Sequence, residues 1–102
     1  MRLRHDDFPA LEHYLGAYLH QDWDDDFQSP EMAFEDYIAG EPRWASEIAA
    51  ELTTVLESGE DDAAIEELLR DAGSFYLPSK HGVAPSAWLA RLLSMCPGAT
   101  DE

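Results

Sequence analysis

The chain has 102 residues, 45% of them hydrophobic, and its 22 Asp and Glu against 6 Lys and Arg give a net charge of -16 and an isoelectric point near 4.2. This apolar content is too high for a disordered acidic tail, and the length suits one compact domain. We therefore expect residues 1–102 to form a single domain. The acidic surface argues against nucleic acid or a membrane as a partner and favours a basic protein.

The sequence indicates neither a disulfide framework nor a membrane anchor. Cys96 is the only cysteine, which fits a reducing compartment. No segment approaches the roughly 20 apolar residues that span a bilayer, and the N-terminal MRLRHDDF has no apolar run behind its arginines. We expect a cytoplasmic protein.

Helical periodicity begins near the N-terminus. Apolar residues recur three and four positions apart along one stripe: Phe8, Leu11, Leu15 and Tyr18. Asp7 is a suitable N-cap, and Pro9 falls in the first turn, where its missing N–H costs nothing. The pattern predicts a first helix that ends near Leu19.

Two more helices follow. Ser29 and Pro30 start the second, and Gly40 ends it. Its apolar stripe is Phe34, Tyr37 and Ile38. The third runs from Pro42 to Gly59 and has the longest stripe, so we expect it to be the central helix. That stripe is Trp44, Ile48, Leu52, Val55 and Leu56.

The C-terminal half predicts two helices separated by a loop. Asp61 or Asp62 caps a fourth helix that ends at Gly73, and Pro85 opens the last one. Their inward faces are Ile65, Leu68, Leu69 and Ala72, then Trp88, Leu89, Leu92 and Leu93. Pro97 and Gly98 are expected to end the last helix.

The segment between these two helices, residues 73–85, is rich in Gly, Pro and Ser. We expect a loop in which Phe75, Tyr76 and Leu77 form an aromatic plug in the core. Because no run alternates as a strand does, the predicted fold class is all-α, a single compact bundle of about five helices.

Residues 20–26, HQDWDDD, raise the question of a metal site. Three aspartates alternate as at the start of an EF-hand loop: Asp22, Asp24 and Asp26. The sixth position is Phe27 instead of Gly and the twelfth is Ala33 instead of Glu, so the calcium pattern fails. His13 and His20 lie seven residues apart without a completing ligand set. We expect no metal and no other cofactor.

Catalytic motifs are absent from the sequence. It contains no GxSxG and no glycine-rich phosphate loop, and Cys96 precedes Pro97 with no histidine nearby in the sequence. We expect a protein that is not an enzyme.

Acidic residues also stand four apart within the predicted helices, where each such pair costs about 0.2–0.5 kcal/mol. The pairs are Glu31 with Glu35, Glu47 with Glu51, Asp62 with Glu66, and Glu67 with Asp71. Only Glu66 has an obvious cationic neighbour, Arg70. The excess acid favours a basic partner, although an acidic face that only keeps the protein soluble would show the same pattern.

The segment FPALEHYLGAYLHQDW, from Phe8 to Trp23, resembles the contact-dependent growth inhibition immunity proteins that carry YxHQDW at the end of their first helix. That resemblance implies a small cytosolic protein that binds and blocks a partner toxin, an RNase for some members. The motif is common to members with different toxins, so we interpret it as scaffold: Tyr18, His20, Gln21, Asp22 and Trp23.

Within this scaffold, we expect Tyr18 and Trp23 to anchor the helix end to the core and His20 to cap it, with its imidazole near the last carbonyls. Partner binding is assigned instead to acidic residues peculiar to this chain. These are Asp24, Asp25 and Asp26 in a loop, Glu31 and Glu35 behind them, and Glu60, Asp61, Asp62 and Glu66.

The sequence thus predicts an immunity protein, monomeric or weakly dimeric when free, that binds the C-terminal toxin domain of a contact-dependent inhibition effector. A nuclease is the natural target, because its phosphate-binding surface must be basic. An alternative is an acidic DNA mimic or adaptor that sequesters a basic nucleic-acid-binding protein.

Overall fold

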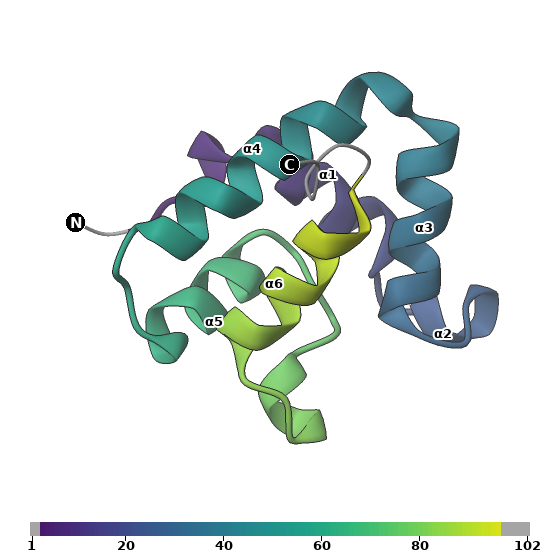
Figure 1. The fold of residues 1–102 in the computed structure, drawn as a ribbon. Helices are drawn as coiled ribbons and strands as arrows, with labels where there is room; N and C mark the ends of the chain where they lie inside the picture. The colour runs from purple at the N-terminus through teal and green to yellow at the C-terminus, as the bar shows by residue number, and fades with distance from the viewer. Residues whose placement is uncertain (1–2, 97–102) are drawn as a thin grey trace.

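A computed structural model describes residues 3–96, and within this range the secondary structure is entirely helical (Figure 1). The elements are η1 (His5–Asp7), α1 (Pro9–Tyr18), α2 (Trp23–Asp26), α3 (Pro30–Gly40), α4 (Pro42–Glu57), α5 (Asp62–Asp71), η2 (Pro78–His81) and α6 (Pro85–Met95). The predicted all-α fold class is confirmed. The five predicted helices correspond to α1, α3, α4, α5 and α6, while α2 and the two 3₁₀ turns, η1 and η2, were not predicted.

Helix α4 is the central element, as its long apolar stripe predicted. It packs against α1, α3 and α6, and α5 packs on α6 (Figure 1). The largest side chains of the core are fully buried: Trp88, Tyr14, Tyr37, Phe34, Leu11, Leu15, Leu19, Ile48, Leu52, Ile65, Leu68 and Leu69.

Local capping signals position two of these helices. The Ser29 hydroxyl accepts the N–H of Met32 at 3.2 Å at the start of α3. Asp61, not Asp62, caps α5, because its carboxylate accepts the N–H of Ala64 at 2.9 Å. The stop expected for the last helix, Pro97 and Gly98, lies outside the described residues.

The start of α1 departs from the prediction. Asp7 ends η1, and the N-cap position belongs to Phe8, which has no side-chain acceptor. The missing acceptor comes from α4: the Glu51 carboxylate accepts the N–H of Leu11 at 2.8 Å and of Ala10 at 3.1 Å. Glu51 is only 8% exposed, so it is a buried helix cap and not the surface acid that its spacing from Glu47 suggested.

Two tyrosines join α1 to α3 through buried hydrogen bonds. The Tyr37 hydroxyl donates to the carbonyl of Ala10 at 3.0 Å, and the Tyr14 hydroxyl donates to the carbonyl of Pro30 at 2.8 Å. Their rings lie 5.5 Å apart, and the edge of Phe34 meets Tyr14 at 5.0 Å. Burial raises the pKa of Tyr14 well above its usual value, so its hydroxyl stays a donor at neutral pH.

The expectation that Phe75, Tyr76 and Leu77 all lie in the core is wrong for Phe75. Tyr76 and Leu77 are buried, but Phe75 is 63% exposed. The Tyr76 ring fills the available space, with Trp88 at 5.1 Å on one side and Trp23 at 5.7 Å, edge-on, on another. Phe75 is therefore left outside, with its backbone fixed by an N–H bond of 2.9 Å to the carbonyl of Leu19.

A first prediction concerns the Glu51 cap. Glu51→Ala leaves two buried N–H groups without an acceptor and should reduce the free energy of unfolding by at least about 2 kcal/mol, since each buried unpaired donor costs about 1–3 kcal/mol. Glu47→Ala, at an exposed position one turn earlier on the same helix, is the control and should change it by less than about 0.5 kcal/mol. Urea unfolding monitored by circular dichroism measures both, and equal losses would refute the assignment.

A second prediction follows from the pKa of Glu51, which burial raises above the ordinary 4.5 even though two backbone N–H groups favour the carboxylate. The folded state therefore holds this proton more tightly than the unfolded state. The contribution of Glu51 to stability is full below about pH 4.5 and declines as the pH rises through the raised pKa.

The variant Glu51→Gln does not titrate at this position, so its stability lacks this decline. The unfolding free energy of the wild type should therefore fall relative to that of Glu51→Gln as the pH rises from about 5 to about 7. Urea unfolding at several pH values measures the difference. A shift in the opposite direction would show that the cap lowers the pKa of Glu51.

A third prediction separates Phe75 from its neighbour. Tyr76→Ala should cost about 3–5 kcal/mol of unfolding free energy, as for other large aromatic truncations in a core. Phe75→Ala should change it by less than about 0.5 kcal/mol because most of that ring is already in water. Thermal melts compare the two variants, and a large loss for Phe75→Ala would place its ring in the core after all.

Candidate functional site

The HQDW segment forms the turn between α1 and α2. Helix α1 ends at Tyr18, and the N–H of Trp23 donates to the carbonyl of His20 at 3.0 Å. The His20 imidazole does not lie on the last helix carbonyls as expected. Its Nδ1 accepts the N–H of Asp22 at 3.1 Å, because the chain turns back over the ring immediately after it. His20 therefore shapes the turn and does not cap the helix.

The aromatic residues of this segment reach the core. The Trp23 ring is partly buried and meets the ring of Tyr76 edge-on at 5.7 Å. Tyr18, also partly buried, lies 5.2 Å from the ring of Tyr37, and its hydroxyl donates to Glu41 at 3.3 Å. Gln21 is exposed on the turn. These contacts support a scaffold role for the motif.

The three aspartates after Trp23 belong to α2, one helical turn, and not to the expected loop. The turn closes because the N–H of Phe27 donates to the carbonyl of Trp23 at 3.0 Å, and acids so close to a helix N-terminus are favourable there. Asp24, Asp25 and Asp26 are all exposed. Asp26 lies 3.9 Å from His20 Nε2.

Several of the other predicted binding acids have partners within the chain. Glu31 lies 3.3 Å from Arg91 on α6, a neighbour that the sequence did not reveal because it is 60 residues away. Glu66 pairs with Arg70 at 3.2 Å, as its spacing suggested. Asp62 accepts the N–H of Ser86 at 2.9 Å, which ties α5 to α6. Hydrogen bonding from the side chain and from the backbone N–H of Ser86 lowers the pKa of that carboxyl.

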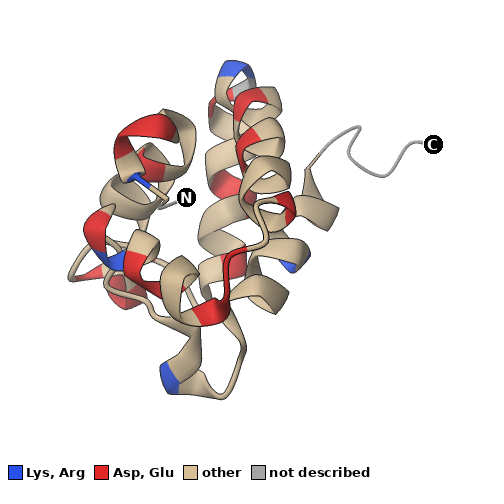
Figure 2. Ribbon diagram, turned by 90° about the vertical axis from the view of Figure 1, so that its left-hand side faces the viewer, with Lys and Arg blue, Asp and Glu red and all other residues tan. Residues whose placement is uncertain are grey.

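The acids therefore divide into two groups. Asp61, Asp62, Glu31 and Glu66 have structural partners, and the N–H of Glu60 donates to Ser58. In contrast, Asp24, Asp25 and Glu35 are exposed, and their carboxylates make no ion pair within residues 3–96. Figure 2 shows acidic positions on most helices in view and only a few basic ones.

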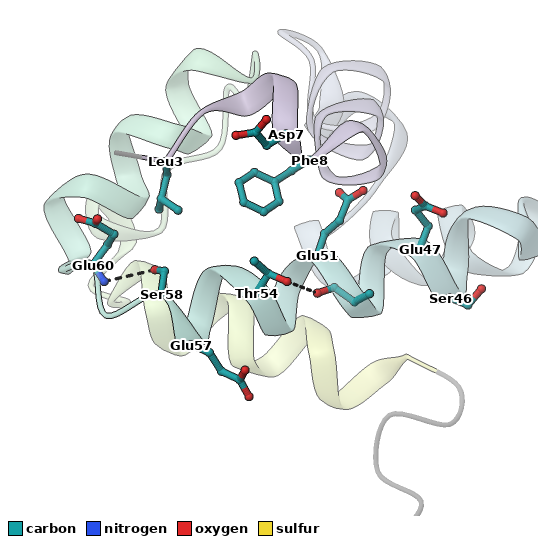
Figure 3. Close-up of a pocket in the computed structure, with 11 residues that line it drawn as sticks. Leu3, Asp7, Phe8, Ser46, Glu47, Glu51, Thr54, Glu57, Ser58 and Glu60 are labelled. Atoms are coloured by element: carbon teal, nitrogen blue, oxygen red, sulfur yellow. Dashed lines mark hydrogen bonds between the residues drawn. The ribbon is translucent and has the colours of Figure 1, made fainter. Parts of the chain in front are cut away.

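Sequence reasoning missed a groove of about 790 Å³ between the N-terminal segment and α4 (Figure 3). Its lining comes from Leu3, Asp7, Phe8, Ser46, Glu47, Ala50, Glu51, Thr54, Glu57, Ser58 and Glu60. Five of these eleven residues are acidic and none is basic. The groove brings residues 3–8 together with residues 46–60, which are far apart in the sequence, so only the tertiary structure reveals it.

The described residues offer little for catalysis or metal binding. Burial raises the pKa of the Cys96 thiol to about 11, so it is protonated at neutral pH and a poor nucleophile. Between residues 3 and 96, no three His, Cys, Asp or Glu side chains form a group that could hold a metal ion. No helix in the same range is long and apolar enough to cross a membrane.

The comparison with protein families agrees with the resemblance to contact-dependent growth inhibition immunity proteins. A family model described as CdiI immunity protein matches residues 7–95, which include every helix from α1 to α6. No significant match was found among curated proteins or solved structures. The chain therefore belongs to the CdiI immunity protein family, and its function is toxin-neutralising immunity.

Proposed function

We propose that the chain neutralises a nuclease toxin domain by covering the basic surface on which that toxin binds its nucleic acid. The observation that carries this proposal is the net charge of -16 in a protein of an immunity family. A nuclease must hold phosphates with Lys and Arg, and a polyanionic protein can compete for the same groups. Enzyme activity is not required for this function.

The structure supports the α2 turn as the main contact. Asp24 and Asp25 are exposed beside each other, and their carboxylates have no ion pair within residues 3–96. Forming a salt bridge with the toxin therefore breaks none inside the protein. Glu35 on α3 is exposed in the same way, whereas Glu31 would first have to leave Arg91.

The scaffold beneath this turn favours tight binding. Trp23 is held against Tyr76, and the backbone at His20 and Asp22 is hydrogen-bonded, so the aspartates project from a fixed base. A binding surface that is already ordered loses less conformational entropy on association. The turn therefore acts as a preformed anionic surface.

The chemistry of inhibition requires no covalent step. Carboxylates placed over the phosphate-binding Lys and Arg side chains exclude the nucleic acid by occupying its charge sites and by electrostatic repulsion of its backbone. Long-range attraction between the opposite charges also accelerates encounter, which matters for a protein that must capture a toxin before it acts.

The proposal predicts that Asp24→Lys with Asp25→Lys weakens binding of the cognate toxin domain by at least about tenfold, mainly through slower association, because like charges then meet at the contact. The toxin domain is that encoded directly upstream of the immunity gene. The control Asp36→Lys with Asp71→Lys makes the same change in net charge at two other exposed positions. Surface plasmon resonance measures both rate constants.

Equal effects of the two double variants would indicate a response to net charge alone and would contradict the α2 contact. A nuclease assay of the toxin with each variant tests the target class directly. If the upstream domain binds the protein but cleaves neither RNA nor DNA, the nuclease part of the proposal is wrong.

A further inference from the structure

The groove between η1 and α4 lies at the opposite end of α1 from the α2 turn, since its lining includes Asp7 and Phe8, which precede α1. We propose that this groove binds an arginine side chain of the toxin, an inference that rests on the proposed function. Helix α1 is only about 15 Å long, whereas a standard interface is roughly 30 Å across. One partner can therefore contact both ends.

The apolar part of the groove suits the stem and flat face of an arginine. In Figure 3 the Leu3 side chain and the Phe8 ring point toward the groove, and because Phe8 is only 7% exposed, a small part of its ring forms the apolar wall. Ala50 adds an exposed methyl group from α4. The methylenes and the weakly hydrated guanidinium of an arginine can lie against such an apolar wall, which a compact, strongly hydrated ammonium does less well.

The acidic part supplies the charge that an arginine needs. Asp7 and Glu47 are exposed on the two sides of the groove, and neither carboxylate has an ion pair within residues 3–96. Glu51 lies between them, with its charge shared with the N–H groups of Ala10 and Leu11. Glu57 points away from the groove in Figure 3 and is left out of the proposed site.

The same lining disfavours other occupants. An anion would meet acidic side chains without any basic one, and a purely apolar segment would remove Asp7 and Glu47 from water without compensation. The groove residues do not form a group of three metal ligands in the described chain. A cationic side chain with an apolar stem satisfies both parts of the lining.

Filling the groove tests the proposal. Ala50→Arg places a guanidinium of the protein itself in the groove and should weaken toxin binding at least about tenfold. Ala90→Arg is the matched control, because Ala90 is also an exposed alanine within a long helix, α6, and the charge change is the same. It should change the affinity less than about twofold. Circular dichroism melts verify that both variants fold.

Removal of a single groove carboxylate is the second arm. Glu47→Gln should weaken binding several-fold, whereas Asp71→Asn, an exposed acid on α5, should not. If the toxin domain binds the wild type and the Ala50→Arg protein with equal affinity, the groove proposal is overturned while the proposed function stands.

A small probe tests the groove without the toxin. N-acetyl-arginine amide, titrated into the labelled protein, should shift the amide signals of Phe8, Glu47 and Ala50 in NMR spectra, and the uncharged N-acetyl-citrulline amide should not. Shifts spread evenly over all exposed acids would overturn the proposal. A toxin domain that does not bind the wild type, combined with specific groove shifts, would refute the proposed function and leave the arginine site in place.

Discussion

The structure depends on one buried carboxylate. Helix α1 begins without a cap of its own, because Phe8 occupies the N-cap and Asp7 belongs to the preceding 3₁₀ turn. Glu51 of α4 accepts the N–H groups of Ala10 and Leu11 and places a negative charge at the positive end of the α1 dipole. The position of α1 on α4 is thereby fixed, and with it the HQDW turn that follows α1.

The role of Glu51 shows that some of the acids of this chain hold the fold together and do not belong to a binding surface. Like-charged pairs in helices suggest a surface made for a basic partner, yet Glu51, Asp62 and Glu31 each have a structural partner. Exposed acids one helical turn away, Glu47 next to Glu51 and Glu35 next to Glu31, make no ion pair in the described chain. The net charge therefore overestimates how many acids are available to a partner. Hydrogen bonds and ion pairs within the chain identify the acids that have a structural role.

Local signals explain why the five long helices were predictable. A proline in the first turn, a serine or aspartate cap and a 3.6-residue apolar period are properties of neighbouring residues, so Ser29 and Asp61 act as expected. The Glu51 cap and the pair of Glu31 with Arg91 join residues 40 or more positions apart, which periodicity does not record. The prediction that Phe75 lies in the core failed because the Tyr76 ring occupies the space beside Trp88.

The HQDW turn and the aspartates that follow it separate residues that hold the structure from residues that face water. Trp23 packs inward on Tyr76, and His20 Nδ1 accepts a hydrogen bond from the backbone of the turn. The residues directly after them, Asp24 and Asp25, project into water from the same helical turn. Because inward and outward roles fall on different residues, the exposed ones can change without loss of the packing that holds the turn. The packing of the turn therefore places no constraint on the side chains at positions 24 and 25, which are free to match a partner.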